Sequence, residues 1–196
     1  MLKNKDNYLF YKIVSNTFTF LGHIIFWDKI IGKNNIPLDK SCILAGNHTS
    51  IFDSYLLFRS TKRPIHFIAK KELFTGPFGW LFKKMHLIPV DREHKNEEAK
   101  EYTLELLKNN KIIGIFPEGT FHDKGSKTKK ELLLPFKPGA VSFSIKSGAP
   151  IIPFAIVGKI KLFSRPKIIF GSPIDISKIK GDKVKYLEEV VKKMLI

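Results

Sequence analysis

The sequence predicts an α/β protein with a mixed, largely parallel central sheet flanked by helices. Short apolar runs alternate along the chain with longer segments whose apolar residues recur at helical spacing. Such alternation is typical of strands joined by crossover helices, which leave neighbouring strands parallel. The 196 residues suit one main domain, and their 43% hydrophobic content provides a core and excludes a disordered chain.

The first expected element is an apolar helix in the N-terminal segment 1–36. Between Ile13 and Trp27 there is no Lys, Arg, Asp or Glu, but this run is shorter than the ~20 residues that a membrane-spanning helix needs. Two interpretations follow, a helix lying in the membrane interface and a helix docked on the protein's own core. In the first, amphipathic rings would be the anchors and lysines would face lipid phosphates. The expected anchors are Tyr8, Tyr11 and Trp27, and the expected lysines are Lys3, Lys5 and Lys12.

Residues 37–196 are expected to form the single main domain. Apolar runs bounded by turn residues predict its strands, and amphipathic or capped segments predict its helices. The expected strands are 42–46, 66–69, 87–90, 112–116, 151–157 and 167–170. The expected helices begin after Ser50, span 95–108, run from Pro138 to Gly148, and include Val184 to Met194 at the C-terminus.

An aromatic segment follows the second expected strand. Lys70 to Phe74 leads into the turn-rich Thr75-Gly76-Pro77, and four large apolar residues come next. They form either a short helix or an apolar lobe, and their side chains belong either to the core or to an apolar groove. These residues are Phe78, Trp80, Leu81 and Phe82.

The formal net charge is +16, from 34 Lys and Arg against 18 Asp and Glu, and it is spread along the whole chain. Such a field attracts anionic partners, namely an anionic membrane surface, a phosphorylated substrate or nucleic acid. Proteins that read bases rely on arginine, and this chain has few arginines, so nucleic acid ranks below a membrane surface. The lone Cys42 lies in an expected strand, which indicates a core residue, no intrachain disulfide and a reducing, cytosolic setting. The spacing of the histidines predicts no metal site.

A histidine and an aspartate flank the start of the first expected helix of the main domain. His48 follows the apolar run 42–46, and Asp53 comes five residues later. The two side chains converge if His48 lies in the loop and Asp53 lies in the first helical turn, with Thr49 or Ser50 as the N-cap. A general base with an orienting carboxylate would have this arrangement. Alternatively, Ser50-x-x-Asp53 is a capping box and Asp53 only closes the helix end.

Other chemically useful side chains follow later expected strands. Arg92 follows 87–90, and Glu118, Gly119 and Thr120 follow 112–116. Carboxyl ends of parallel strands meet at one edge of a sheet, where ligands bind in this class of fold. Lys137 precedes an expected helix N-terminus, which favours anions. Each residue alone has a structural explanation, but together they predict a site at this edge.

These residues resemble the sequence blocks of the glycerolipid acyltransferase family, in particular bacterial 1-acylglycerol-3-phosphate acyltransferases. The resemblance covers about residues 40–175, and it implies that 37–196 is an acyltransferase domain. Two positions depart from the family pattern, because His86 stands where glycine is usual and Phe121 where arginine is usual. The matching blocks are Asn47 to Asp53, Ile88 to Arg92, Phe116 to Thr120 and Ile151 to Ala155.

The resemblance implies transfer of a fatty acyl group to the free hydroxyl of 1-acylglycerol-3-phosphate, which gives phosphatidic acid. The co-substrate that donates the acyl group would be acyl-CoA or acyl carrier protein, and no cofactor is expected. His48 would be the base and Asp53 its partner, and Arg92 would hold the phosphate. Glu118 would accept a hydrogen bond from a substrate hydroxyl. Gly119, Thr120 and Lys137 would complete the substrate site.

Three alternatives remain open at this point. In the first two, the acceptor would be glycerol-3-phosphate or another lysophospholipid, because Phe121 stands where the family has an arginine expected beside the acceptor. In the third, the chain would be a non-catalytic, basic membrane-binding module. In each case the expected location is the cytoplasmic face of the cell membrane, with peripheral or monotopic attachment.

Overall fold

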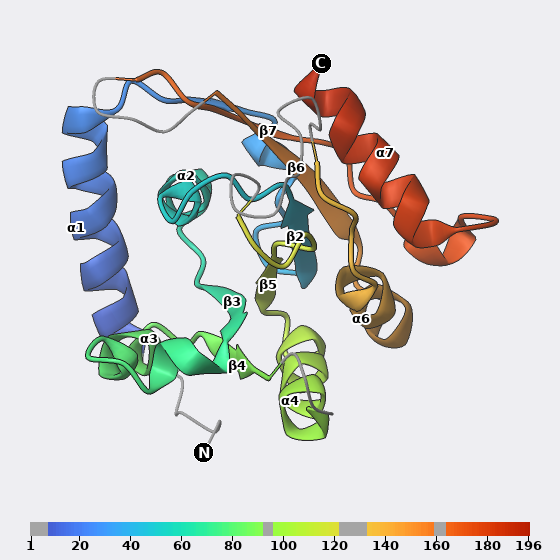
Figure 1. Ribbon diagram of the computed structural model, residues 1–196, viewed down its shortest axis with the longest axis horizontal. Coiled ribbons are helices and arrows are strands. Elements are labelled where there is room, and N and C mark those ends of the chain that lie inside the picture. The colour runs from blue at the N-terminus through green and yellow to red at the C-terminus, as the bar shows by residue number, and fades with distance from the viewer. Residues whose placement is uncertain (1–7, 92–95, 122–132, 159–163) are drawn as a thin grey trace.

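The computed structural model describes residues 8–91, 96–121, 133–158 and 164–196, and a seven-stranded sheet runs through its centre (Figure 1). The strand order is β1-β7-β6-β2-β5-β3-β4. Each predicted strand is present, whereas β1 was not predicted because its apolar run is very short. The strands are β1 (Lys29–Ile31), β2 (Cys42–Gly46), β3 (Ile65–Lys70), β4 (Ile88–Val90), β5 (Ile112–Ile115), β6 (Ile151–Val157) and β7 (Lys167–Phe170).

The sheet is mixed and mostly parallel, as predicted. Strands β6, β2, β5, β3 and β4 are parallel neighbours, β7 runs antiparallel to β6, and β1 pairs in parallel with β7. A parallel pair needs a crossover of about a dozen residues or more. Strand β6 ends at Val157 and β7 begins at Lys167, so the chain between them is too short for a crossover.

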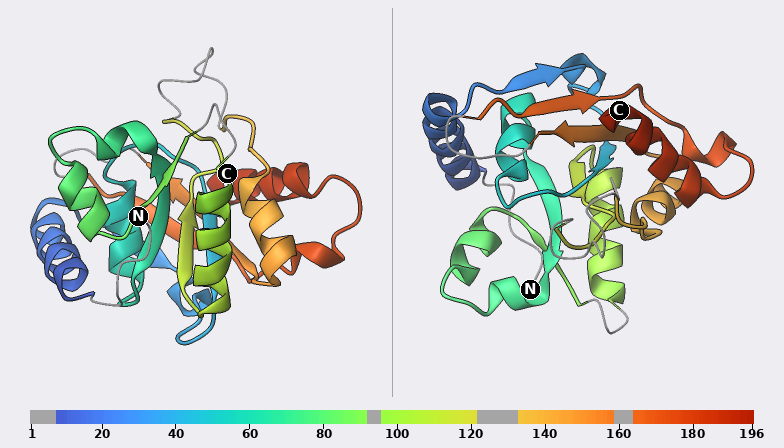
Figure 2. Two further views of the ribbon diagram at one scale, coloured as in Figure 1. Left: turned by 90° about the horizontal axis from the view of Figure 1, so that it is seen from below. Right: turned by 45° about the horizontal axis from the view of Figure 1, so that its top comes forward.

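Helices cover both faces of the sheet (Figure 2). Helices α1 and α2 lie over one face, and α4, α6 and α7 lie over the other. Strand β2 explains why both faces need cover, because all five of its residues are buried. Ile43 and Ala45 join one core cluster, and Cys42 and Leu44 join the other. The helices are α1 (Leu9–Ile25), α2 (Asp53–Ser60), α3 (Gly79–Lys84), α4 (Glu97–Lys108), α6 (Gly139–Ser147) and α7 (Lys183–Leu195).

Helix α1 docks on α2 with one face and leaves another face uncovered. Tyr11, Ser15 and Gly22 are buried on the docked face, and a Cβ at Gly22 would overlap the ring of Tyr55. Five large apolar side chains of α1 are exposed, and no helix among the described residues has the length and apolarity to cross a bilayer. The docked interpretation is therefore confirmed for one face. The exposed apolar residues are Leu9, Ile13, Phe20, Leu21 and Ile24.

Two of the expected lipid anchors of this helix lie against protein. Tyr11 is only 3% exposed, and its hydroxyl accepts a 2.9 Å hydrogen bond from the Ile65 amide, so its assignment as a lipid anchor is wrong. Tyr8 is half-buried, with its hydroxyl 3.3 Å from Nε2 of His66. Trp27 is exposed, as an anchor should be. Lys3 and Lys5 lie outside the described residues.

His86, one of the two departures from the family pattern, has an unusual backbone. Its φ of 56° lies in the left-handed region, where glycine is favoured. The main-chain oxygen of His86 lies 3.1 Å from Nδ1 of the buried His66, and its ring contacts Tyr8 at a centroid distance of 4.6 Å. The ring contact with Tyr8 holds a side chain at a turn where the resemblance leads us to expect glycine.

Two further predictions concern Cys42 and the division of the chain. Cys42 is fully buried, and burial raises the pKa of its thiol to about 12, so it is a core residue as predicted. The boundary at residue 36 stays a prediction. Strand β1 lies on the N-terminal side of this boundary and pairs with β7.

Candidate active site

The site begins where β2 ends, at Asn47. Its side-chain amide donates a 2.9 Å hydrogen bond to the Ile156 carbonyl, and its side-chain oxygen accepts a 2.7 Å bond from the Ile156 amide. Asn47 thus continues the pairing of β2 with β6 by one step beyond the strand. It fixes the main chain immediately before His48. We predicted no role for Asn47 from the sequence, although a side-chain amide at a strand end can both donate and accept a hydrogen bond to the neighbouring strand.

His48 and Asp53 meet as predicted. Nδ1 of His48 lies 2.8 Å from Oδ2 of Asp53, and the aspartate side chain is fully buried. His48 lies in the loop, and Asp53 is the first residue of α2. Because the carboxylate accepts, Nδ1 carries the proton and Nε2 is the basic nitrogen. This is the tautomer that a general base acting through Nε2 requires.

Asp53 also holds the loop before the helix. Its carboxylate accepts hydrogen bonds from the amides of Thr49 (2.6 Å) and Ser50 (2.9 Å) and from the Thr49 hydroxyl (2.9 Å). The N-cap position falls at Phe52, so the prediction of Thr49 or Ser50 as the N-cap is wrong. The bond from the Ser50 amide to Asp53 is nevertheless half of the expected capping box. Asp53 therefore both closes the helix entry and orients the imidazole.

Two phenyl rings fix the plane of the His48 imidazole. Phe116 stacks on it at 3.8 Å between centroids with an interplanar angle of 15°, and Phe121 contacts it at 4.3 Å and 48°. Phe116 is itself held by Phe67 at 6.1 Å and by Phe154 at 5.8 Å. The His48 side chain keeps 18% of its surface exposed. Phe121, the second departure from the family pattern, thus stabilises the orientation of His48 by packing.

Glu118 lies beneath the His48 loop. It is 4% exposed, and its two carboxylate oxygens accept hydrogen bonds from the amides of His48 (2.7 Å) and Leu134 (2.8 Å). We predicted that Glu118 would face a substrate hydroxyl. In the structure its carboxylate holds the main chain of His48, so Glu118 positions the base, and its contact with a substrate hydroxyl stays a prediction.

Gly119 and Lys137 lie together at the carboxyl end of β5. Gly119 has a φ of 75°, in the left-handed region that favours glycine, and a Cβ built there would lie 3.1 Å from Nζ of Lys137, so the lysine side chain lies against this turn. The Lys137 amide donates a 2.9 Å bond to the Pro117 carbonyl, which places its side chain over this turn. Thr120 follows, half-buried. Arg92 lies outside the described residues, next to Asp91 at the end of β4.

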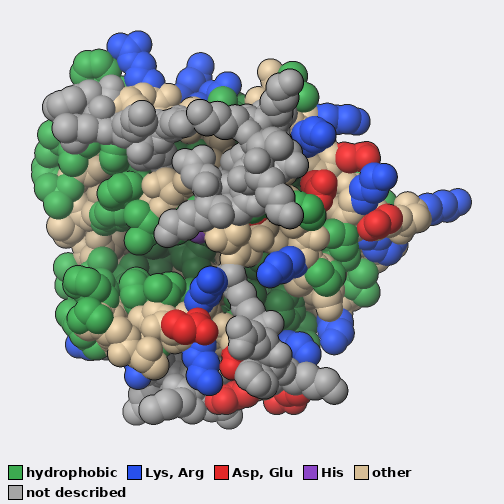
Figure 3. Space-filling model, viewed as in Figure 1, with side chains coloured by type: hydrophobic (Ala, Val, Ile, Leu, Met, Phe, Trp, Pro, Cys, Tyr) green, Lys and Arg blue, Asp and Glu red, His purple; other side chains and the backbone are tan. Residues whose placement is uncertain are grey.

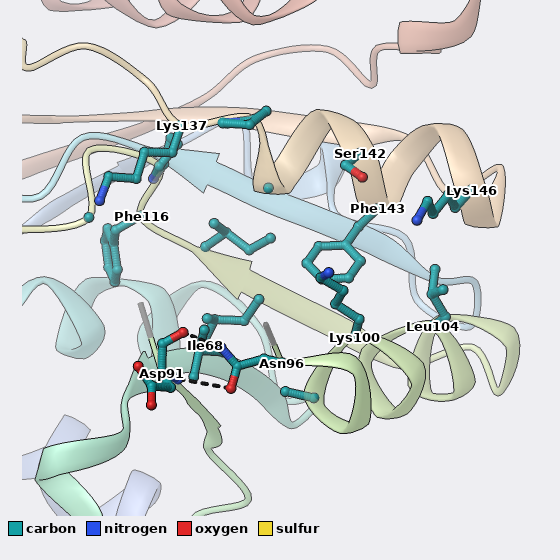
Figure 4. Close-up of a pocket in the computed structure, with 17 residues that line it drawn as sticks. Ile68, Asp91, Asn96, Lys100, Leu104, Phe116, Lys137, Ser142, Phe143 and Lys146 are labelled. Atoms are coloured by element: carbon teal, nitrogen blue, oxygen red, sulfur yellow. Dashed lines mark hydrogen bonds between the residues drawn. The ribbon is translucent and has the colours of Figure 1, made fainter. Parts of the chain in front are cut away.

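A largely apolar cavity of about 610 Å³ begins beside Phe116 and runs between α4 and α6 (Figure 4). Phe116 and Lys137 lie at one end, and Phe143, Leu104 and Lys146 lie at the other. His48 does not line the cavity itself, but it stacks on the ring of Phe116, which does. A long apolar chain joined to a polar group beside His48 would fit this arrangement.

The expectation of no metal site stays a prediction. Within the part of the chain that the structure describes, no three His, Cys, Asp or Glu side chains gather in a way that could hold an ion. The described site thus consists of a histidine–carboxylate pair, a lysine and an apolar cavity at the carboxyl ends of parallel strands. It has the geometry of a general-base site for group transfer to a hydroxyl.

Comparison with known proteins identifies the enzyme family to which this chain belongs. The model of the Acyltransferase family matches residues 29–157, and the chain belongs to that family. It is 33% identical over 171 residues to the 1-acyl-sn-glycerol-3-phosphate acyltransferase of Bacillus subtilis, covering 84% of this chain and 82% of that protein. The enzyme of the same name from Streptococcus pneumoniae is 30% identical over 164 residues, which are 80% of this chain and 58% of that protein.

A solved structure agrees with these relatives. The crystal structure of the 1-acyl-sn-glycerophosphate acyltransferase PlsC from Thermotoga maritima superposes with a TM-score of 0.69 at 26% sequence identity. The match covers 95% of this chain and 77% of the Thermotoga chain. The similarity therefore extends over nearly the whole fold, including the strands that carry the candidate site.

Proposed function

We propose that this chain transfers a fatty acyl group from a thioester donor to the free hydroxyl of 1-acylglycerol-3-phosphate, giving phosphatidic acid. The observation that carries the proposal is the 2.8 Å contact between His48 and a fully buried Asp53, next to an apolar cavity. The names of the Bacillus, Streptococcus and Thermotoga relatives support this acceptor. The donor is acyl-CoA or an acylated acyl carrier protein, and no cofactor is required.

In the proposed mechanism the acceptor is itself the nucleophile. Nε2 of His48 takes the proton of the acceptor hydroxyl while the hydroxyl oxygen bonds to the thioester carbonyl carbon. Asp53 stabilises the imidazolium that forms. The tetrahedral intermediate then collapses, the carbon–sulfur bond breaks, and the leaving thiolate recovers the proton from His48. Main-chain amides near Gly119 or at the start of α2 are the candidates for stabilising the oxyanion.

The positions of the two substrates follow from the two ends of the site. The acyl chain of the donor would occupy the cavity between α4 and α6, which has an apolar lining suited to methylene groups. Arg92 would hold the acceptor phosphate in a bidentate contact, and Lys137 would contribute a second cation. The thioester would then lie beside Phe116 and within reach of His48.

The cavity predicts a change in chain-length preference. Ser142 lies on the cavity side of α6, so the Ser142→Phe variant should shorten the space for the acyl chain. We expect it to lower transfer from long-chain donors about tenfold relative to donors shorter by a few methylene groups, because each buried methylene that is lost costs about 0.8 kcal/mol. The measurement is kcat/KM over a series of donor lengths. Ile145→Phe is the matched control, because Ile145 is exposed on the same helix and outside the cavity lining. Equal profiles for both variants would contradict this placement of the chain.

Arg92 gives a prediction about the acceptor. Arg92→Ala should raise KM for 1-acylglycerol-3-phosphate by about tenfold to a hundredfold with a smaller effect on kcat, because a hydrogen-bonded charge pair is lost. KM for an uncharged monoacylglycerol, measured in parallel, should not change. An unchanged KM for the phosphorylated acceptor would mean that its phosphate is held elsewhere.

Membrane association is part of the proposal. The exposed apolar face of α1 and the formal charge of +16 support contact with an anionic membrane surface, in a peripheral or monotopic mode. The expected side is the cytoplasmic face, where soluble acyl-CoA or acyl carrier protein is available. The acceptor, a lysophospholipid, would come from the same surface.

A panel of acceptors tests the proposed function. Purified protein is incubated with a labelled acyl thioester and, separately, with 1-acylglycerol-3-phosphate, glycerol-3-phosphate, other lysophospholipids or no acceptor, and the products are identified by mass spectrometry. Phosphatidic acid as the main product supports the proposal. A preference for glycerol-3-phosphate or another lysophospholipid would change the acceptor, and vesicle binding without any transfer would favour a non-catalytic membrane module.

A further inference from the structure

A short basic and aromatic segment leaves the sheet between β3 and β4. We call residues Lys70–Lys84 the α3 lobe; it contains the 3-10 turn η2 (Lys71–Phe74) and helix α3. Its apolar middle is flanked by the lysine pairs Lys70-Lys71 and Lys83-Lys84, and Glu72 is its one acidic residue. The lobe therefore combines an apolar centre with a basic border.

The sequence suggested that these aromatic residues belong to the core or line a groove, and the structure contradicts the core interpretation for two of them. Phe78 is 61% exposed and Trp80 is 57% exposed, with Leu73 at 46% beside them. None of the three lines the cavity of the site. Large side chains exposed together in this way indicate an interaction surface rather than core.

The outward position of these side chains is built into the fold of the lobe. Gly79 is buried, and a Cβ there would overlap the main-chain oxygen of Phe74, so the two halves of the lobe approach closely. The rings of Phe74 and Phe82 pack together beneath, at 6.2 Å between centroids. These inner contacts hold Phe78 and Trp80 on the outside.

The lobe is continuous with the exposed face of α1. The Trp80 ring lies 6.0 Å from the ring of Phe10 in α1, and Nζ of Lys84 lies 5.1 Å from the Phe10 centroid and 5.6 Å from that of Trp80. In Figure 3 hydrophobic side chains gather on the same side of the molecule, over α1 and over α3. The two elements thus present one apolar surface with lysines at its border.

We propose that the α3 lobe is a second membrane contact, in which Phe78 and Trp80 enter the interface of an anionic bilayer while the flanking lysines meet lipid phosphates. The inference rests on the membrane association proposed above for α1. Tryptophan favours the level of the lipid headgroups, and lysines that border an apolar patch complement anionic lipid rather than an apolar protein partner. The lobe leaves β3 at its carboxyl end, the sheet edge that carries His48, so contact here brings that edge to the lipid surface.

The chain allows a direct test because it has two tryptophans, Trp27 and Trp80. In the Trp27→Phe variant, Trp80 alone reports its surroundings through tryptophan fluorescence. The full chain is titrated with vesicles of phosphatidylcholine and phosphatidylglycerol, with and without bromine on the acyl chains. We expect the Trp80 emission to shift to shorter wavelength and to be quenched by the brominated lipid. Vesicles of phosphatidylcholine alone should give a weaker response.

The Trp80→Phe variant, in which Trp27 is the reporter, separates the possible outcomes. Quenching of Trp27 without quenching of Trp80 would overturn the lobe contact and leave association through α1 intact. Quenching of neither would overturn both contacts. A Trp80 shift that depends on protein concentration without vesicles would show that a second copy covers the lobe, which also overturns the inference.

A second pair of variants tests the affinity for vesicles. Phe78→Ser combined with Trp80→Ser should weaken binding to anionic vesicles by at least about tenfold. Tyr186→Ser, at a half-exposed ring on α7, should leave binding unchanged. Acyl transfer to a short-chain acceptor in solution should be equal in all variants. This last assay distinguishes loss of the membrane contact from failure of the proposed chemistry, and unchanged vesicle affinity in the double variant would contradict the inference.

Discussion

Replacement of His48 by alanine is expected to lower kcat for acyl transfer by about 10²–10⁴-fold, the usual contribution of a positioned general base. Phe116 and Phe121 flank the His48 imidazole and Asp53 lies behind it, and none of these three side chains has a basic nitrogen. The His48 side chain is partly exposed, so its truncation should change the free energy of unfolding little.

The measurement is steady-state kinetics alongside thermal unfolding. His23→Ala is the matched control, because His23 is exposed on α1, away from the site. It should retain both activity and stability. A folded His48→Ala variant with near-native turnover would contradict the proposed mechanism.

Asp53→Asn is expected to lower kcat by about 10³–10⁴-fold, for a different reason. An amide nitrogen turned toward Nδ1 would favour the other imidazole tautomer, with its proton on Nε2, where it cannot accept from the acceptor hydroxyl. The same orientation would set that NH2 group against the amides of Thr49 and Ser50, which now donate to the same oxygen, Oδ2, as His48. The opposite orientation would keep those bonds and leave only the Thr49 hydroxyl without its acceptor, Oδ1. The free energy of unfolding should therefore also fall, by about 1–3 kcal/mol.

The control for Asp53 is Asp182→Asn. Asp182 also accepts main-chain hydrogen bonds at a helix start, from the amides of Val184 and Lys185, but it lies at α7. Asparagine is a good N-cap, so this variant should keep both kcat and stability. If Asp53→Asn lost stability but kept its kcat, Asp53 would be a capping residue alone, which is the structural alternative that the sequence left open.

The features that the sequence predicted well are local ones. Strand β2 appears as a run of buried residues, and the convergence of His48 with Asp53 depends on one turn between a strand and a helix. Period and spacing within a few residues determine such features. The cap at Phe52 shows the limit, because the Asp53 carboxylate binds the amides of Thr49 and Ser50 in the loop, while the Ser50 hydroxyl accepts from the Phe52 amide ahead of the helix.

The features that were missed depend on partners far away in the sequence. Asn47 bonds to Ile156, and Glu118 bonds to the amides of His48 and Leu134. Neither role can be predicted from the residues next to Asn47 or Glu118 in the sequence. The same limit explains Tyr11, which looked like a lipid anchor and instead accepts from the Ile65 amide. The aromatic lobe was ambiguous because composition does not reveal whether Trp80 faces inward or outward.

The central claim is that His48 activates an acceptor hydroxyl which attacks the thioester directly. Release of thiol from the donor, followed with a thiol reagent while phosphatidic acid is quantified by mass spectrometry, tests this claim most directly. We expect that thiol release by the wild-type protein requires 1-acylglycerol-3-phosphate, equals the phosphatidic acid formed, and falls to background in His48→Ala. Thiol release at an undiminished rate without acceptor, or in the His48→Ala variant, would contradict it.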